Sequence, residues 1–339
     1  MTFTLPPEAE ATAPPEWRGL PRDEVRLMAV TPDAITSSRF RDLPGLLEPG
    51  DLVVVNTSAT LPARVAALRA DGVTVPLHVS TTLDDGSWVV EVRRPANDGP
   101  DPRIEPGTVV TLPGGVSLTL LGSFPAGRPS RLWRARADPP VRATSYLPRY
   151  GVPIRYGYLH GTFPLSAYQN VYATEPGSAE MASAGRPFTA ELLVALMARG
   201  IVVAPVVLHT GVSSPEAHEP PYPERFAVPE TTARLVNATR SAGRRIVAVG
   251  TTVTRALEST ADDDGATHPA TGWTDLVLGP DRPARVVSGL ITGLHAPEAS
   301  HLRLLEAVAG ADLVEAAYRR AVAEHYLWHE FGDSMLFLP

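Results

Sequence analysis

The sequence predicts an α/β fold with a smaller all-β unit inserted into the chain. From Pro62 to about Pro140, short β-prone runs are separated by Asp-Gly, Pro-Gly and Gly-Gly turns, as in a small barrel or sandwich. After Tyr146, segments of helical spacing alternate with strand-like runs, which is typical of α/β proteins. We therefore expect a discontinuous larger α/β domain over residues 1–61 and 141–339, and an inserted all-β domain over residues 62–140.

The segments before the insertion are expected to form an arm and the first strands of the larger domain. The first 20 residues are rich in Pro, Ala and Glu, which predicts an irregular arm. Val25–Val30 is β-prone, and Leu52–Asn56 is an apolar run of the kind that forms a buried strand. The turn Pro49-Gly50-Asp51 marks the start of that strand.

The later elements follow from periodicity and turn residues. The β-prone runs of the insertion are 64–69, 73–79, 88–93, 108–112, 116–121 and 132–137. Helices are expected over 190–199, 231–242, 252–259, 299–308 and 313–326, with strands over 201–208, 244–249, 276–277 and 285–287. Thr189 is a candidate N-cap for the first of these helices, and Gly200 suits a left-handed position at its end.

Composition restricts the class of protein and the kinds of chemistry. A chain of 339 residues with 44% hydrophobic content can bury a large core. No apolar run approaches the roughly 18 residues of a membrane span, and the N-terminus lacks signal-peptide features, so we expect a cytoplasmic protein without a membrane segment. The absence of cysteine excludes thiolate nucleophiles and cysteine-ligated metal, and the absence of lysine excludes Schiff-base chemistry on a lysine side chain.

Charge and histidine spacing give weaker indications. The net charge of −7 disfavours a large nucleic-acid footprint. Seven arginines between Arg128 and Arg155 could supply a local basic patch, or they could belong to a solvated strand face. The nine histidines are scattered, and His325 and His329 alone stand four residues apart near the C-terminus, where we interpret them as capping or packing the last helix. We therefore expect no metal site.

Candidate site residues lie where strands end. His209 follows the strand expected over 201–208, and His295 follows another apolar run, at sheet positions that collect ligands in α/β folds. Gly250-Thr251-Thr252 forms a strand–turn–helix crossing whose N–H groups could bind a carboxylate, a phosphate or a ribose. Each has a structural alternative: the histidines could be satisfied edge residues, and Arg255 could simply pair with Glu258 on one helix.

The segment 168–189 reads as a binding loop, because turn formers and polar groups lie between strand-like and helix-like flanks. Its Tyr-Gln-Asn-Val-Tyr-Ala start and Pro-Gly centre resemble the YQTVYA-x-x-PG…PTAGLHFT signature of the S-adenosylmethionine:tRNA ribosyltransferase-isomerase family of queuosine biosynthesis. Further segments are similar to other blocks of that family, in the same order along the chain: 50–56 with 61–64, 249–259, 272–275, 286–297 and 331–336. The resemblance therefore covers almost the whole chain.

This resemblance implies a fold, a reaction and a site. The fold would be a larger, barrel-like α/β domain with a small β-barrel. The reaction would use S-adenosylmethionine as ribosyl donor to the 7-aminomethyl group of a deazaguanine in tRNA, releasing adenine and methionine without a metal. Proton transfer would fall to His209 and His295, with the carboxylates Glu224 and Asp333 as further candidates; which group is acid and which is base stays open. The substrate-binding candidates are Asn56, Arg64, Tyr168, Gln169, Tyr172, Ser183, Gly185, Arg186, Gly250, Thr251, Thr252 and Arg255.

Departures from the family pattern concentrate in its motifs. Arg186-Pro187 replaces a Leu-His pair, and Ala59 stands where the family has an arginine. The stretch after His209 is shortened and has lost a histidine, and part of it, including His218, lies outside the residues that the structure describes. Two alternatives therefore remain open. The chain could be a paralogue that uses S-adenosylmethionine with another acceptor or cleaves it without transfer, or an inactive nucleoside- or RNA-binding protein.

Overall fold

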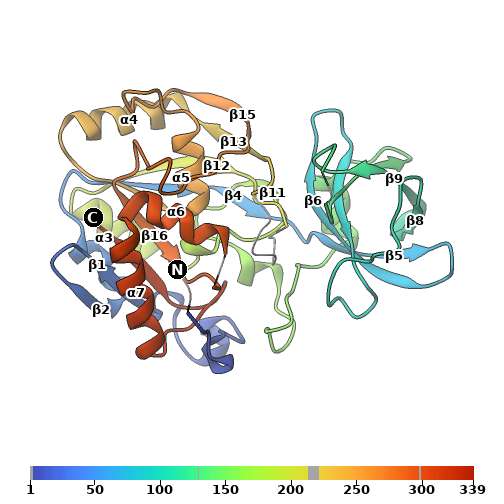
Figure 1. Ribbon diagram of the computed structural model, residues 1–339, viewed down its shortest axis with the longest axis horizontal. Helices are drawn as coiled ribbons and strands as arrows, with labels where there is room; N and C mark the ends of the chain where they lie inside the picture. Colours follow the sequence, from blue (N-terminus) through green and yellow to red (C-terminus); the bar gives the residue numbers. More distant parts are fainter. Residues whose placement is uncertain (1–2, 129, 213–220, 298) are drawn as a thin grey trace.

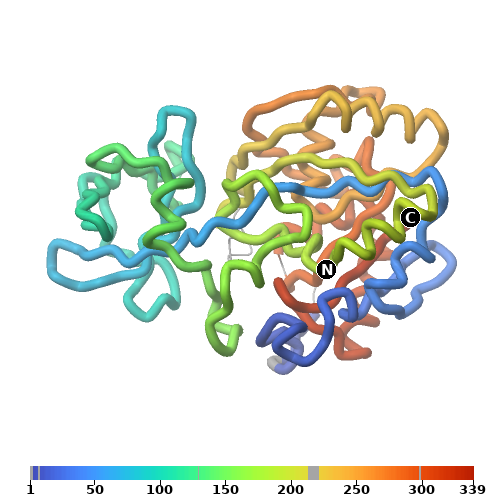
Figure 2. Tube along the Cα trace, turned by 180° about the vertical axis from the view of Figure 1, so that it is seen from behind, coloured from blue at the N-terminus to red at the C-terminus, as the bar shows by residue number. Residues whose placement is uncertain are grey.

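The computed structural model describes residues 3–128, 130–212, 221–297 and 299–339, and it contains two structural units (Figure 1). The larger unit is built on a nine-stranded mixed sheet, and the smaller one is a closed six-stranded antiparallel barrel. The back view in Figure 2 shows the chain passing from the larger unit into the barrel and returning. This confirms the predicted α/β fold with an inserted all-β barrel, but the expectation that the larger domain is barrel-like is wrong, because its nine strands form an open sheet with β15 and β2 at its edges.

Four parallel strands form the centre of the large sheet. The full strand order is β15 (Ala270–Thr274), β13 (Glu224–Val228), β12 (Val202–Leu208), β3 (Leu52–Asn56), β14 (Ile246–Val249), β16 (Gly289–Gly293), β17 (Ser334–Phe337), β1 (Arg26–Val30) and β2 (Ile35–Arg39). Strands β12, β3, β14 and β16 are mutually parallel, so their carboxyl ends meet at one edge. Strands β13 and β15 extend the sheet antiparallel beyond β12.

The barrel strands lie within the range expected for the inserted domain. They are β5 (Arg64–Arg69), β6 (Thr74–Thr82), β7 (Trp88–Val92), β8 (Val109–Leu112), β9 (Val116–Ser123) and β10 (Trp133–Asp138). A short parallel pair, β4 (Ser58–Thr60) with β11 (Glu175–Ser178), precedes and follows the barrel in the chain. The boundaries of the two domains, 61/62 and 140/141, stay a prediction.

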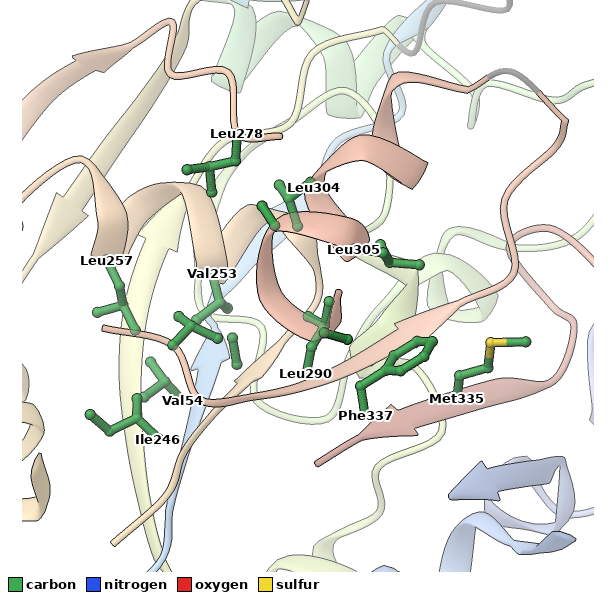
Figure 3. Packing of buried hydrophobic residues seen from close by; sticks show 14 of the residues in the cluster. Val54, Ile246, Val253, Leu257, Leu278, Leu290, Leu304, Leu305, Met335 and Phe337 are labelled. Carbon is green, nitrogen blue, oxygen red and sulfur yellow. The ribbon is translucent and has the colours of Figure 1, made fainter. Parts of the chain in front are cut away.

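Helices cover both faces of the sheet because its strands bury alternate side chains on opposite sides. The α-helices are α1 (Leu43–Leu46), α2 (Ala143–Tyr150), α3 (Ala190–Ala198), α4 (Glu230–Ser241), α5 (Thr251–Glu258), α6 (Ser300–Ala309) and α7 (Ala311–Ala323). Val54 packs with residues of α4 to α7, a core shown in Figure 3, whereas the adjacent Val53 packs with α1 and α3. Short 3₁₀ turns complete the fold at Pro7–Ala9, Pro15–Arg18, Arg22–Glu24, Phe40–Asp42, Pro113–Gly115, Leu165–Tyr168 and Ser183–Gly185.

The strands expected at 276–277 and 285–287 are wrong. Neither segment is a strand, although Leu276, Val286 and Val287 are buried in the core. The carboxylate of Glu258 accepts hydrogen bonds from the backbone N–H groups of residues 285, 286 and 287 at 2.9, 2.9 and 3.0 Å. A side chain thus replaces the neighbouring strand that these N–H groups would otherwise need.

The start and end of α3 match the sequence prediction. The Thr189 hydroxyl accepts from the N–H of Leu192 at 3.1 Å, and Gly200 adopts a left-handed φ of 75° just beyond the helix. The cap satisfies one of the N–H groups that a helix leaves unpaired in its first turn.

Replacing Thr189 with alanine should lower the free energy of unfolding by about 1 kcal/mol, because the N-cap hydrogen bond is lost. The matched control is Thr231→Ala, an exposed threonine inside α4, which should change stability by less than about 0.5 kcal/mol. Urea unfolding followed by circular dichroism measures both values. Equal effects of the two substitutions would contradict the assigned cap.

Candidate functional site

A cavity of about 430 Å³ lies at the carboxyl ends of β12, β14 and β16. Its wall includes residues 210–212 after β12, 250–252 after β14, and 292–297, which are the last two residues of β16 and the four that follow. The remaining sides are closed by the segments 180–184 and 276–278, the start of α6, Tyr156 and Tyr158 after α2, and residues 329–330. The cavity therefore occupies the sheet edge where the sequence predicted a ligand site.

The predicted Gly250-Thr251-Thr252 crossing lines this cavity. Gly250 has φ 92°, which favours glycine, and it precedes the first turn of α5. The first N–H groups of a helix have no partner within the helix, and they favour anionic or polar ligands. The Thr252 Oγ1 atom is buried and has no hydrogen-bond partner in the described residues. This corner therefore offers donors to a carboxylate or to sugar hydroxyls.

Arg255 and Glu224 both line the cavity, and they form an ion pair with each other. The buried guanidinium also donates to the carbonyls of Leu276 at 3.1 Å and Thr274 at 3.0 Å. Glu224 accepts from the N–H of Gly211 at 2.9 Å. The alternative of an Arg255–Glu258 pair within α5 is wrong, because Glu258 binds the backbone of 285–287 instead.

His295 lies in the cavity wall just after β16. The Thr292 hydroxyl donates its one hydrogen to the Gly293 carbonyl at 3.1 Å, so its oxygen accepts from His295 Nε2 at 3.0 Å. That tautomer leaves the Nδ1 lone pair available. The ring stacks on His301 with centroids 4.6 Å apart. Burial, with smaller contributions from His301 and His329, holds the pKa of His295 well below its usual value, so the ring is neutral at pH 7.

His209 does not line the cavity, although its neighbour Thr210 does. Its Nδ1 hydrogen-bonds to Ser58 Oγ at 2.7 Å, and Ser58 contacts Ser178 Oγ at 2.6 Å. The ring packs so closely on the Gly177 backbone that no side chain would fit there. Burial, and to a smaller extent Arg225, lowers the pKa of His209. The structure thus places this candidate where it joins β12 to the β4–β11 pair.

Three further candidates, Asn56, Gln169 and Tyr172, also lie outside the cavity, where protein groups surround them. The buried Asn56 amide bonds to both backbone groups of Leu208, at 2.8 and 3.0 Å. The Gln169 amide bonds to both backbone groups of Thr60, at 3.0 and 2.7 Å. Tyr172 packs edge-on against Phe188.

The candidates Tyr168, Gly185, Arg186 and Asp333 surround the junction of the binding loop with the N-terminal arm, not the cavity. Tyr168 stacks edge-on against Phe331, and Gly185 leaves room for the ring of Tyr172. Arg186 is 2% exposed, donates to the Ala167 carbonyl at 2.9 Å and pairs with Glu16 at 2.7 Å. Asp333 accepts from the N–H groups of Arg26 and Leu327, each at 2.8 Å.

Arg64 lies at the start of the barrel strand β5, opposite His78 of β6, and it is not in the cavity wall. Ser183, in contrast, does line the cavity, within the 3₁₀ turn that precedes α3. Only some of the predicted site residues therefore line the cavity. They are the substrate-binding candidates Ser183, Gly250, Thr251, Thr252 and Arg255 and the catalytic candidates His295 and Glu224.

The cavity also has an acidic and aromatic end that sequence reasoning missed. Glu180 and Glu330 line it with Tyr156, Tyr158 and His329. Tyr156 donates to Glu180, and the ring of Tyr158 stacks on that of His329 with centroids 4.4 Å apart. The His325–His329 spacing was the one available signal. We expected this pair to cap or pack the last helix; α7 ends at Ala323, and His329 lies beyond that end, in the cavity wall.

Not all of the arginines expected as a basic patch are exposed. Arg131 is buried and pairs with Glu91 at 3.0 Å, and it donates to the Val212 carbonyl at 3.3 Å, which connects the barrel to the cavity wall. Arg134 pairs with Asp85. The exposed members of the group are Arg128, Arg136, Arg142 and Arg149.

Replacing Glu224 with alanine should destabilise the protein by about 3 kcal/mol, because the buried Arg255 charge loses its carboxylate partner. The matched control is Glu230→Ala in α4, where Glu230 faces Arg234 across an exposed pair at 3.6 Å. That control should change stability by less than about 1 kcal/mol. Chemical unfolding of both variants tests the difference, and a Glu224→Ala loss no larger than the control's would overturn this interpretation.

Stability should also depend on the protonation of Glu330. Burial, reinforced by the charge of Glu180, raises the pKa of Glu330 from 4.5 to about 8. The folded state therefore holds a proton that the unfolded state releases above pH 4.5, so this contribution is complete at low pH and is lost as pH rises towards 8. The stability of the wild type relative to Glu330→Gln should fall by about 1.4 kcal/mol per pH unit across this window.

Urea unfolding of the wild type and Glu330→Gln at pH 5, 6.5 and 8 measures this slope. Glu175→Gln, at an exposed position on β11, is the control and should show a far smaller change with pH. A stability difference between wild type and Glu330→Gln that stays constant from pH 5 to pH 8 would exclude the raised pKa.

Among the described residues, no group of three or more histidine, aspartate or glutamate side chains could hold a metal ion. No helix within those residues has the length and apolar character needed to cross a bilayer.

Comparison with known proteins gives matches over nearly the whole chain. A family model described as "Queuosine biosynthesis protein" matches residues 1–337. A protein of Symbiobacterium thermophilum named S-adenosylmethionine:tRNA ribosyltransferase-isomerase is 36% identical, over 99% of this chain and 98% of its own length. A protein of the same name from Acidiphilium cryptum is 35% identical, over 98% and 97%. The crystal structure of S-adenosylmethionine tRNA ribosyltransferase from Thermotoga maritima aligns over 99% of both chains with a TM-score of 0.56 and 32% identity.

Proposed function

The chain belongs to the queuosine biosynthesis protein family, and on that premise we propose that it is an S-adenosylmethionine:tRNA ribosyltransferase-isomerase. The proposed reaction transfers and isomerises the ribosyl group of S-adenosylmethionine onto the 7-aminomethyl group of a deazaguanine in tRNA, forming epoxyqueuosine and releasing adenine and methionine. S-adenosylmethionine is then a co-substrate. A cytoplasmic location is part of the proposal, because that is where tRNA is found.

The observation that carries this proposal is the cavity at the carboxyl ends of β12, β14 and β16, which combines a helix N-terminus with a neutral histidine. The N–H groups at the start of α5 and the unpartnered Thr252 hydroxyl suit the carboxylate of the methionine moiety or the ribose hydroxyls. Arg255 contributes positive potential but is already bound by Glu224 and by carbonyls, so we assign it a positioning role.

His295 is the candidate base. The sulfonium of S-adenosylmethionine acidifies the neighbouring C5′ hydrogens, so that a neutral base in contact with C5′ could remove one and leave an ylide. His295 is neutral because burial lowers its pKa, and its Nδ1 lone pair makes no hydrogen bond in the described residues. Departure of adenine requires a proton donor, and the protonated Glu330 carboxyl in the same cavity is the candidate. His209 then keeps a structural role.

The acidic end of the cavity favours a second candidate function. Glu180 lies in a cavity of a chain with net charge −7, and negative charge disfavours phosphate groups there. A paralogue that cleaves S-adenosylmethionine, or transfers its ribosyl group to an acceptor without phosphates, would fit this charge. Adenine release that depends on tRNA supports the first function, and release without tRNA supports the second.

Replacing His295 with glutamine should lower the rate of adenine release by at least about 100-fold, since a general base is lost. Donor binding, measured by calorimetry, should stay within a few-fold of the wild type, because His295 is not assigned to donor binding. The control is His268→Gln, an exposed histidine that bonds to Asp262 at 3.0 Å away from the cavity. Full turnover by His295→Gln would remove the base assignment.

A further inference from the structure

Arg64 and Arg155, called here the arginine pair, lie on two neighbouring segments, one that enters the barrel and one that returns from it (Figure 2). Arg64 begins β5 and forms an antiparallel bridge with Val152, in which the N–H of each residue bonds to the carbonyl of the other at 2.9 Å. Arg155 follows three residues after Val152, and both arginines are half-buried. Burial, and then the charge of Arg155, lowers the pKa of Arg64, so the two guanidinium groups lie within electrostatic range of each other.

Neither guanidinium group of the arginine pair has a carboxylate partner among the described residues. Arg155 donates one hydrogen bond, to a backbone carbonyl at 2.8 Å, and the Arg64 guanidinium donates none in that part of the chain. The nearby buried arginines differ, because Arg93 and Arg131 each pair with Glu91 at 3.0 Å. Two like charges that are held partly out of water without a counterion are unfavourable for the fold, and such an arrangement is typical of a site that binds an anion.

The arginine pair lies beside the cavity but outside its wall. Arg155 directly precedes Tyr156, which lines the cavity. Tyr168 is within electrostatic range of both places. Burial, followed by the Glu330 carboxyl of the cavity wall, raises the pKa of the Tyr168 phenol to about 12, and the charges of the arginine pair oppose this rise. An anion bound by the arginine pair would therefore lie next to the aromatic end of the cavity.

We propose that Arg64 and Arg155 bind a phosphate group of an RNA strand whose nucleotide base enters the cavity. The identity of this strand rests on the proposed function. A guanidinium group presents N–H donors that match two oxygens of a phosphate, so two such groups can bind one phosphodiester together. A phosphate bound next to an extruded base holds that nucleotide in position without reading its sequence.

Other anions fit this place less well. The carboxylate of S-adenosylmethionine is assigned to the cavity corner at residues 250–252, whereas the arginine pair lies outside the cavity wall. The chain has a net charge of −7, and Glu180 lies in the cavity, so an RNA strand needs a local positive site to approach this edge. The arginine pair therefore favours the tRNA acceptor over an acceptor without phosphates.

Binding of an unmodified tRNA transcript, measured by fluorescence anisotropy between about 50 and 200 mM salt, tests the arginine pair. Arg64→Gln and Arg155→Gln should each weaken binding about tenfold at the lower salt concentration, since a charged phosphate contact is lost. The double variant should reduce the slope of log Kd against log salt by about 0.7 to 0.9, as expected for one phosphate. The control is Arg234→Gln, at an exposed position of α4, which should bind the transcript like the wild type.

A binding site also predicts how these substitutions affect the fold. Neither arginine leaves a carboxylate unpaired when it is replaced, and the repulsion between the two charges is removed. The midpoint of urea unfolding should therefore be unchanged or higher in both single variants than in the wild type. A clear fall of this midpoint in both variants would show that the two arginines hold the fold, and it would overturn the site.

The arginine pair and the proposed function can fail separately. If both single variants bind the transcript with the affinity and salt dependence of the wild type, the phosphate site is overturned, while adenine release that depends on tRNA carrying the 7-aminomethyl base still supports the function. A wild type that does not bind the transcript also overturns the site. If binding depends on the arginine pair but that tRNA causes no adenine release, the site stands and the proposed reaction fails.

Discussion

The buried Arg255 guanidinium holds four parts of the larger unit around one cavity. Arg255 belongs to α5, pairs with Glu224 at the start of β13, and donates to carbonyls of β15 and of the segment that follows it. Glu224 in turn accepts from Gly211, after β12. A buried charge is stable only when it is paired and hydrogen-bonded, so these contacts are mutually dependent. They fix the wall in which the helix N-terminus and His295 lie.

The cavity has two ends with opposite electrostatic character. Around His295 the surroundings are neutral, because burial disfavours the charged form of that ring and of its stacking partner His301, whose pKa falls to about 4. At the other end, burial and the charge of Glu180 raise the pKa of Glu330, so Glu330 stays protonated. Burial thus leaves His295 able to accept a proton and Glu330 able to donate one. A reaction that includes both proton removal and proton donation requires two such groups.

Several motif residues hold the scaffold rather than the cavity. Arg186, which stands in the segment that departs from the family pattern, clamps the N-terminal arm through Glu16. Asn56 joins the ends of β3 and β12, and Asp333 joins β1 to the segment before β17. A motif match therefore identified the family reliably but did not separate residues that contact a ligand from those that position the loops around it.

The sequence by itself determined the parallel strands, the capped helix α3, the inserted barrel and the strand ends where His295 and Gly250-Thr251-Thr252 line the cavity. These features depend on local periodicity, on turn chemistry and on the rule that parallel strands end at one edge. Only the tertiary structure decided that Glu224 is the partner of Arg255, that Glu258 replaces a strand at 285–287, and that Glu180, Glu330 and His329 share a cavity. Those contacts join segments far apart in the chain, and their charges and pKa values arise from burial, which no local pattern records.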